Sequence, residues 1–261
     1  GLLCQIHVRY ANGTEEWIVS DGTWKTHLDG PIRMNDIYNG ESYDARREMP
    51  GWSQPGFSDT QWQPVQVAEF PMDNLTASNG LPVRKIQYLP AQRVFRTPKG
   101  ELVVDFGQNM VGWVRLNLRG PAGTVVTVRH AEVLDKAGNF YTDNLRKADC
   151  KLEYTMKGSG AEVYEPRFTF MGFRYVSVEG LSGNLAPGDI TGVVVHSDMP
   201  PTGRFECSNP LINQLQHNIQ WGQKGNFVDV PTDCPQRDER LGWTGDAQAF
   251  CRTAAYNMGV A

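Results

Sequence analysis

The chain has 261 residues, which leaves room for two domains of ordinary size and a remnant. Its formal net charge is -4, with 25 basic and 29 acidic residues intermixed, so no basic stripe is available to neutralise phosphates and we expect no nucleic-acid partner. The hydrophobic content of 40% and charged content of 21% are typical of a soluble globular protein, and no apolar run approaches the roughly 20 residues that span a bilayer, so we expect no membrane partner.

Residues 1–70 are predicted to form short strands separated by turns. The segment from Gln5 to Tyr10 alternates polar and apolar side chains, as a half-buried strand does. Asn12-Gly13 follows it and signals a hairpin, because a type I′ turn needs positive φ at both central residues. The sequence begins almost inside a strand, so we expect the natural protein to continue upstream or this domain to be a partial one. It opens without Met or a basic n-region, so we expect that any signal peptide has been removed or was never present, and the compartment stays open. We predict a partial N-terminal β domain here.

Residues 71–200 are predicted to form a second, central β domain. The stretch 66–82 is rich in Pro, Asn and Gly and marks a junction between domains. Strand-like segments follow at 101–107, 112–118 and 172–178, with no helical crossover between them. This spacing favours an antiparallel β-sandwich over alternating strands and helices.

The pattern changes after residue 200. Asn209 precedes Pro210, which places a capping side chain ahead of a proline suited to the first helical position, and apolar residues then recur at helical spacing. A second helix is expected from Asp246 onward. Residues 201–261 are therefore predicted to be the start of a truncated α domain, and the chain as a whole to be mainly β.

The cysteines indicate neither a disulfide framework nor a zinc site. They lie far apart, form no CxxC pair and are odd in number. We expect buried or free thiols, and no metal, at Cys4, Cys150, Cys207, Cys234 and Cys251.

The densest polar cluster is the stretch 229–246 between the two predicted helices, with five carboxylates, two arginines and a tryptophan. Such a loop suits glycoside cleavage, which needs one carboxyl to protonate the leaving oxygen and a second to activate water, while aromatic faces and hydrogen bonds hold the ring. The alternative from composition alone is a solvated turn whose arginine and aspartate side chains pair with each other.

The string DVPTDCPQRDERLGWTGDAQAF at residues 229–250 resembles the catalytic-loop signature of bacterial α-L-rhamnosidases. Upstream, residues 36–46 resemble the N-terminal β domain of that family, and residues 105–109 and 165–175 resemble its central sandwich. The similarity covers essentially the whole chain in the family's domain order. It implies two β-sandwich-like domains followed by the first helices of an (α/α)6 barrel.

The resemblance also implies roles for acidic residues. Glu239 matches the general acid of the family, and Asp233 and Asp246 match residues that bind the rhamnose hydroxyls. The acid must carry a proton near neutral pH, which the neighbouring Asp238 favours by like-charge repulsion and the adjacent arginines oppose. The sequence leaves that balance open.

Further candidates for the pocket wall are Arg237, Asp238 and Trp243. For Arg240 a structural ion-pair role is favoured. The family's water-activating base is a glutamate much further along the catalytic domain, and a barrel of twelve helices needs on the order of 130 helical residues. We therefore expect this chain alone to be inactive.

Two other features of the sequence could relate to sugar binding. The carboxylates of Asp36, Glu41 and Asp44 could form a calcium-assisted sugar site, but turn capping and cross-strand pairing explain them better. Five tryptophans could stack on sugars, although each is more often a core or inter-domain anchor: Trp17, Trp24, Trp52, Trp62 and Trp113.

The resulting hypothesis is an inverting α-L-rhamnosidase that removes terminal α-L-rhamnose from glycosides or polysaccharides without a cofactor. Two alternatives stay open: a non-catalytic carbohydrate-binding module, and a different six-hairpin glycosidase, since sugar identity depends on pocket geometry. The natural aglycone, the linkage, the oligomeric state and the compartment are not readable from the sequence.

Overall fold

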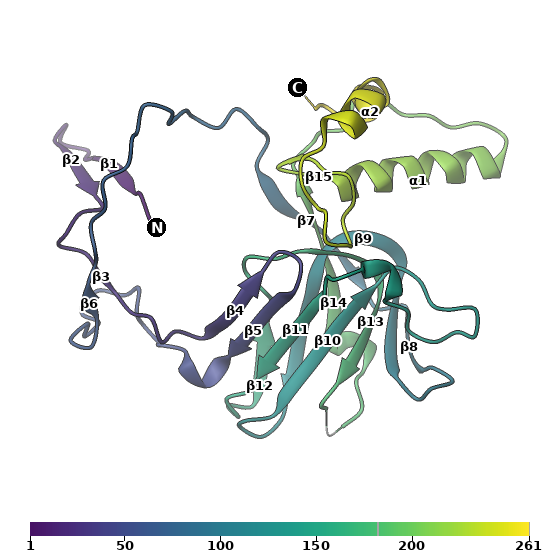
Figure 1. The fold of residues 1–261 in the computed structure, drawn as a ribbon, viewed down its shortest axis with the longest axis horizontal. Coiled ribbons are helices and arrows are strands. Elements are labelled where there is room, and N and C mark those ends of the chain that lie inside the picture. Colours follow the sequence, from purple (N-terminus) through teal and green to yellow (C-terminus); the bar gives the residue numbers. More distant parts are fainter. Residues whose placement is uncertain (182, 261) are drawn as a thin grey trace. The chain divides into compact units, whose positions relative to one another are not determined.

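A computed structural model describes residues 1–181 and 183–260 (Figure 1). The chain divides into two compact units. Unit 1 comprises residues 1–30 and 47–78, and unit 2 comprises residues 31–46 and 79–261.

Unit 1 consists of two small antiparallel sheets joined by long loops. Its strands are β1 (Gln5–Arg9), β2 (Glu15–Val19), β3 (Lys25–Thr26) and β6 (Gln63–Pro64). Strands β1 and β2 form the predicted hairpin, and Gly13 in its turn has φ of +84°. The imidazole of His7 stacks on Trp17 with ring centroids 4.0 Å apart, which is a cross-strand pair. The side chains of this hairpin are mostly exposed.

Unit 2 is built on a ten-stranded sheet in the described part of the chain, here called the large sheet. Its strands run in the order β4-β5-β11-β10-β13-β9-β14-β7, with β8 and β12 also paired to β9 (Figure 1). Their bounds are β4 Ile32–Asp36, β5 Gly40–Asp44, β7 Val83–Pro90, β8 Arg93–Arg96, β9 Leu102–Arg119, β10 Val125–Ala131, β11 Lys151–Thr155, β12 Ala161–Tyr164, β13 Met171–Glu179 and β14 Ile190–Ser197. Short 3-10 helices lie at η1 Ala45–Arg47, η2 Asp143–Leu145 and η3 Pro187–Asp189.

The long strand β9 organises the large sheet, because it pairs with β8, β12, β13 and β14 along its length. The segments 101–107 and 112–118, predicted as separate strands, are parts of this one strand. Gly112 in the middle has φ of +140°, and a Cβ there would lie 1.9 Å from the carbonyl oxygen of Val193. Only glycine fits this close approach between neighbouring strands.

The core of unit 2 follows the alternation of the strands. Strand β11 alternates buried and partly buried residues, as period-2 packing requires. Phe173 of β13 lies fully buried and meets Phe106 edge to face, with ring centroids 5.8 Å apart. Tyr154 of β11 and Tyr164 of β12 stack at 4.7 Å although these two strands do not pair, so aromatic pairs fill the core between separate strands.

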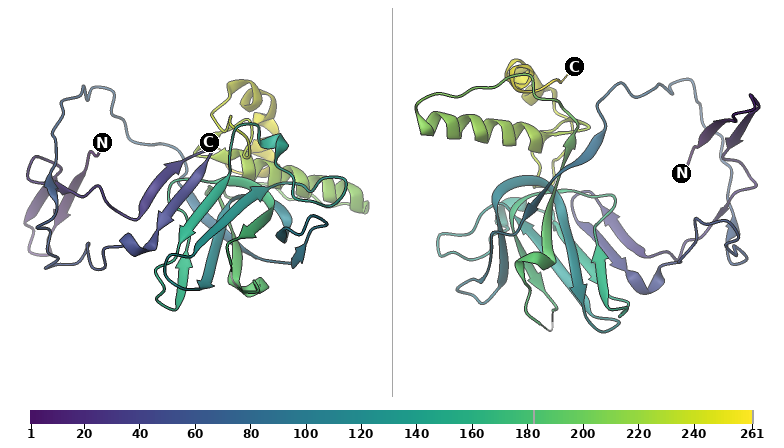
Figure 2. Two further views of the ribbon diagram at one scale, coloured as in Figure 1. Left: turned by 60° about the horizontal axis from the view of Figure 1, so that its bottom comes forward. Right: turned by 180° about the vertical axis from the view of Figure 1, so that it is seen from behind.

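Two helices follow the large sheet: α1 (Pro210–Asn226) and α2 (Thr244–Asn257). The side chain of Asn209 accepts a hydrogen bond from the Leu211 N–H at 3.0 Å, so the predicted cap is confirmed. Helix α1 contacts β9 and β14 at one end of the sheet, as both views of Figure 2 show. Hairpin β15 (Phe227–Val228) and β16 (Val230–Pro231) continues from α1.

The predicted mainly β fold followed by two helices is confirmed. Residues 31–46 belong to unit 2, because β5 pairs with β11 of the large sheet. That pair is also parallel, whereas antiparallel pairing was expected. The boundaries at 70 and 200 stay predictions. No helix among the described residues is long and apolar enough to cross a membrane.

Candidate functional site

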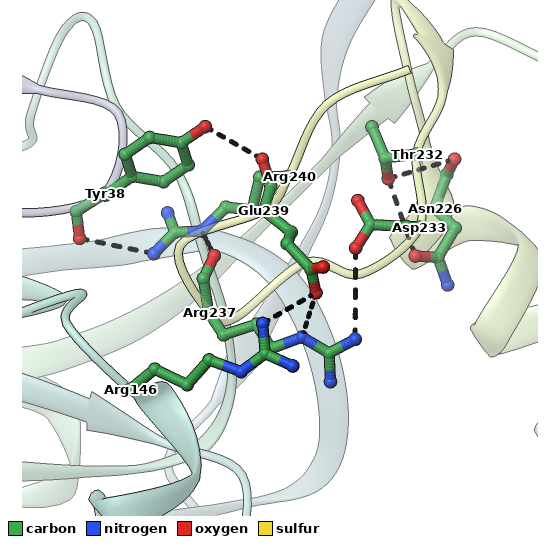
Figure 3. Close-up of polar contacts among 8 residues, drawn as sticks. All are labelled: Tyr38, Arg146, Asn226, Thr232, Asp233, Arg237, Glu239 and Arg240. Carbon is green, nitrogen blue, oxygen red and sulfur yellow. Dashed lines mark hydrogen bonds and ion pairs between the residues drawn. The ribbon is translucent and has the colours of Figure 1, made fainter. Parts of the chain in front are cut away.

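The acidic loop, residues 227–243, connects α1 to α2 and is closed at its base. The turn of the β15–β16 hairpin is formed by Asp229 with φ of +69°. The N–H of Thr232 donates to the Asn226 carbonyl at 2.8 Å, and its hydroxyl donates to the same carbonyl at 3.3 Å (Figure 3). Thr232 also forms a bridge with Gly242. Both ends of the segment 232–242 are therefore tied to the helix termini.

Arg240 fastens this loop to the large sheet. Its side chain is almost completely buried, with 2% of the residue exposed. The guanidinium group donates to three carbonyl oxygens outside the loop, to two carbonyls of the loop itself and to a thiol: Ile37, Tyr38, Phe170, Gln236, Arg237 and Cys150. Its plane also faces the rings of Tyr38 and Phe170, at 5.6 and 5.8 Å.

The expected ion-pair role of Arg240 is therefore wrong in its partner, although the residue is structural. Among the described residues no carboxylate pairs with it. Backbone carbonyls take the carboxylate's place, because the loop and the segments beside the sheet direct several carbonyl oxygens toward the Arg240 guanidinium group. A planar fork with five N–H donors can satisfy several such acceptors at once, which a lysine cannot do.

Further contacts seat the backbone of the loop. The hydroxyl of Tyr38 donates to the carbonyl of Glu239 at 2.8 Å (Figure 3). The thiol of Cys150 donates to the carbonyl of Gln236 at 3.1 Å. Pro235 lies so close to β13 that a Cβ at Gly172 would be 2.8 Å from its Cγ. The glycine in the MGFRY stretch therefore makes room for the loop.

The carboxylate of Glu239 lies between two arginines. Its Oε2 accepts from Nε of Arg237 at 2.5 Å and pairs with Nη1 of Arg146 at 3.2 Å (Figure 3). The side chain is 30% exposed, so it remains open to a ligand from the solvent side. Arg237 comes from the loop, whereas Arg146 follows η2 between β10 and β11.

Asp233 is the most enclosed carboxylate of the loop. Its side chain is 10% exposed and its nearest ionic partner is Nη2 of Arg237 at 3.9 Å, beyond hydrogen-bonding distance. Oδ1 of Asp238 is buried and has no hydrogen-bond partner among the described residues. Buried oxygens of this kind are suited to receive the hydroxyl donors of a sugar.

A hollow of about 410 Å³ lies between the two helices and joins Asp233 to Asp246. Ile219 of α1 and Phe250 of α2 supply part of its apolar wall. Asp246 lies in the first turn of α2, where the helix dipole stabilises a carboxylate, and Trp243 occupies the preceding cap position, half exposed. The structure thus groups Asp233 with Asp246, and Glu239 with Arg237.

The ligand atoms of Asp233, Cys234 and Glu239 lie within 4.8 Å of one another, which is close enough for a metal. However, Arg237 interacts with both carboxylates. Burial also raises the pKa of the Cys234 thiol, which opposes the thiolate that binds metals. We propose no metal at this position.

The three carboxylates weighed for calcium all meet protein donors. Asp36 accepts the N–H groups of Tyr38 and Asn39, both at 2.8 Å. Glu41 is fully buried and accepts from the Tyr164 hydroxyl at 2.8 Å. The carboxylate of Asp44 pairs with Arg46. These contacts are the turn capping and pairing that the sequence favoured.

Sequence reasoning missed Arg146 and the Tyr38 hydroxyl as neighbours of Glu239. It also did not single out Glu132, a carboxylate near Arg237 that accepts from Asn109 at 3.0 Å and whose pKa is raised by burial. No local signal could have found Arg146, because the contact joins two distant segments. The cysteines are all described and all free, as expected.

In a comparison with known protein families, three family models match consecutive segments of this chain. The model of the α-L-rhamnosidase N-terminal domain matches residues 1–87, that of the bacterial α-L-rhamnosidase concanavalin-like domain matches 95–196, and that of the six-hairpin glycosidase domain matches 200–261. The order of domains is that of a six-hairpin glycoside hydrolase with β domains ahead of it.

Curated relatives give the same result. An α-L-rhamnosidase of Streptomyces avermitilis is 51% identical over 98% of this chain and 25% of its own length. An α-L-rhamnosidase of Alteromonas sp. is 42% identical over 99% of this chain and 28% of its length. The chain spans about a quarter of the relatives it matches.

Solved structures agree in fold. The Streptomyces avermitilis α-L-rhamnosidase complexed with L-rhamnose has a TM-score of 0.92 and 50% identity, over 98% of this chain and 25% of that one. The Aspergillus terreus enzyme has a TM-score of 0.94 and 46% identity, over 98% of this chain and 30% of that one. This chain belongs to the bacterial α-L-rhamnosidase family, as the sequence predicted.

Proposed function

We propose that the protein containing this chain hydrolyses terminal α-L-rhamnose from glycosides or polysaccharides, with Glu239 as the general acid. One observation carries the proposal: Glu239 lies on a loop fixed from beneath by Arg240, yet its carboxyl group remains partly exposed. A fixed, accessible carboxyl is what proton delivery to a glycosidic oxygen requires. A relative solved with L-rhamnose supports the choice of sugar.

The proposed reaction is a single displacement with inversion. Glu239 transfers its proton to the glycosidic oxygen as the bond to the anomeric carbon breaks. A second carboxylate removes a proton from water, and that water attacks the anomeric carbon from the opposite face. The products are free rhamnose of inverted configuration and the released alcohol.

Other residues of the loop hold the sugar in this proposal. Asp233 and Asp246 accept hydrogen bonds from ring hydroxyls at the hollow between the helices. The remaining wall residues are Arg237, Asp238 and Trp243. The water-activating base is expected in the part of the family's helical domain that follows these helices, so this chain alone is expected to be inactive.

The test compares the whole protein with the 261-residue chain on an aryl α-L-rhamnoside, and follows the first-formed anomer by NMR. We expect turnover by the whole protein alone, with inverted rhamnose as the first product. Aryl glycosides of other sugars serve as the control for the alternative glycosidase. Sugar binding without turnover by the whole protein would favour a binding module and contradict the proposal.

A further inference from the structure

Arg146 lies against the carboxyl group of Glu239, the proposed acid. Arg146 follows η2 in the connection between β10 and β11, far from the acidic loop in sequence. Its Nη1 lies 3.2 Å from Oε2 of Glu239, and Arg237 contacts the same oxygen at 2.5 Å (Figure 3). The connection between β10 and β11 therefore supplies a cation to the Glu239 carboxyl group from outside the helical region.

The two arginines contact the same one of the two carboxylate oxygens of Glu239. Both point at Oε2, and among the described residues nothing donates to Oε1. A guanidinium group has only donors, so an oxygen that faces two of them does not carry a proton itself. The proton of a neutral Glu239 therefore belongs on Oε1. Arg146 and Arg237 together fix the rotation of the carboxyl group and select the oxygen that delivers the proton.

The backbone at Arg146 is held in an uncommon conformation. Its φ is +59° and its ψ is -109°, which non-glycine residues seldom adopt unless the surroundings impose it. Leu145 before it and Ala148 after it are buried in the core of unit 2. The chain is thus anchored on both sides of Arg146, and the strained residue projects its side chain toward the acidic loop.

The simpler account is an ordinary surface ion pair. The Arg146 side chain is 54% exposed, and ion pairs at such exposed positions contribute little to stability. That account explains neither the backbone conformation nor the convergence of two arginines on one oxygen. It also predicts no effect that depends on the chemistry of the substrate, and this difference can be measured.

We propose that Arg146 is a positioning residue for Glu239, by which the β-sheet unit orients the general acid of the helical domain. The inference rests on the proposed function. It adds a residue of the central β domain to a site otherwise formed by the helical domain. A misplaced acid loses proton transfer, and displacements of about 1 Å can lower rates by on the order of 10²-fold.

The experiment uses Arg146→Gln in the whole protein and measures kcat/KM on rhamnosides with good and poor leaving groups. We expect on the order of a tenfold to hundredfold loss with a poor leaving group and a smaller loss with an activated aryl group, because only the former depends strongly on the acid. Arg146→Lys should restore part of the activity. Lys147→Met, at an exposed neighbouring residue, is the matched control and should leave kcat/KM on both substrates unchanged.

Combination with Glu239→Gln gives the second readout. If Arg146 acts through Glu239, the double variant loses no more activity than Glu239→Gln alone. Equal losses on both substrates, or an additive loss in the double variant, would reject the positioning role while the wild type remains active. A wild type without rhamnosidase activity would reject the proposed function, and this inference with it.

Discussion

The large sheet and the helices α1 and α2 use apolar side chains in opposite ways. In the sheet, Val104 and Phe173 have no exposed surface and belong to one continuous core. In α1, Leu211 is 79% exposed, while the polar Gln223 is buried. The sheet contains its own core, whereas the helices present apolar faces. The acidic loop between the helices is therefore held in place mainly by its contacts with the sheet.

Polar contacts rather than a core join the two helices. Nε2 of Gln223 donates to the carbonyl of Ala254 at 3.1 Å, and its Oε1 accepts from Asn257 at 3.2 Å. Such contacts contribute about 1 kcal/mol each. The two helices are therefore joined to each other by polar contacts, while α1 also packs on β9 and β14 of the large sheet, with Trp221 against its core.

The largest expected effect on stability is at the junction between the acidic loop and the large sheet, where Arg240 lies. Arg240→Ala removes the buried guanidinium group that donates to five backbone carbonyls and the Cys150 thiol, and we expect a loss of about 3–5 kcal/mol in the free energy of unfolding. Urea unfolding of the 261-residue chain measures it. Arg240→Lys should lose less, because it keeps a charge but not the fork. Arg204→Ala, at an exposed ion pair, is the control. An equal loss in its free energy of unfolding would show that the contacts of Arg240 with the sheet contribute nothing special to stability.

A second effect lies beneath the same junction, at His130. Its Nδ1–H donates to the Cys150 carbonyl at 2.9 Å, and Nε2 has no partner among the described residues. Burial lowers the pKa of His130 from 6.5 to about 4, and the charge of Arg240 acts in the same direction. The folded state thus resists a proton that the unfolded state accepts.

The sign of the pH dependence follows from this shift. The stabilising contribution of neutral His130 is complete above pH 6.5 and is lost as the pH falls toward 4. The total is about 3 kcal/mol at roughly 1.4 kcal/mol per pKa unit. Urea unfolding at pH 7 and pH 4.5 should show a smaller difference for His130→Gln than for the wild type. An unchanged difference would exclude His130 as the cause.

A smaller effect is expected at Gly172, where the loop touches β13. The Cβ of Gly172→Ala would lie 2.8 Å from Pro235 Cγ, so the loop must move. We expect a loss of about 1–3 kcal/mol and faster hydrogen exchange confined to residues 232–242. Gly188→Ala, with no atom within 4 Å of the new methyl group, is the control. Unchanged exchange in the loop would show that the sheet does not seat it.

The smallest effect concerns cysteine reactivity. Burial raises the pKa of Cys150 and of Cys234, which lie on opposite sides of the junction, whereas Cys251 is exposed on α2. Since the thiolate is the reactive form, iodoacetamide at neutral pH should label Cys251 first. Peptide mapping by mass spectrometry measures the order. Equal labelling of all three would mean that the junction opens readily.

Local sequence signals predicted the parts of the fold that depend on neighbouring residues. The Asn12-Gly13 hairpin and the Asn209-Pro210 helix start are examples, because turn and cap chemistry lie within a few residues. The pairing of β5 with β11 was missed because it joins residues more than a hundred positions apart. Nothing in the composition of residues 40–44 distinguishes a strand of unit 1 from one of unit 2.

The candidate site shows the same limit. The resemblance of residues 229–250 to the family's loop identified Glu239 and its neighbours, whose roles stay predictions. Arg240 was recognised as structural but assigned carboxylate partners, because backbone carbonyls leave no trace in a sequence. The contact with Arg146 requires the packing of η2 against the loop, which only the fold provides.

The central claim is that Glu239 delivers the proton while Asp233 and Asp246 hold the sugar. The most direct test measures kcat/KM of Glu239→Gln, Asp233→Asn and Asp246→Asn in the whole protein, on a natural glycoside and on an activated aryl rhamnoside. Glu239→Gln should lose about 10²–10⁴-fold on the natural glycoside and much less on the aryl one, whose phenolate leaves with little help. The aspartate variants should lose similar amounts on both. Equal losses for Glu239→Gln on the two substrates, or a leaving-group-dependent loss at either aspartate, would contradict the account.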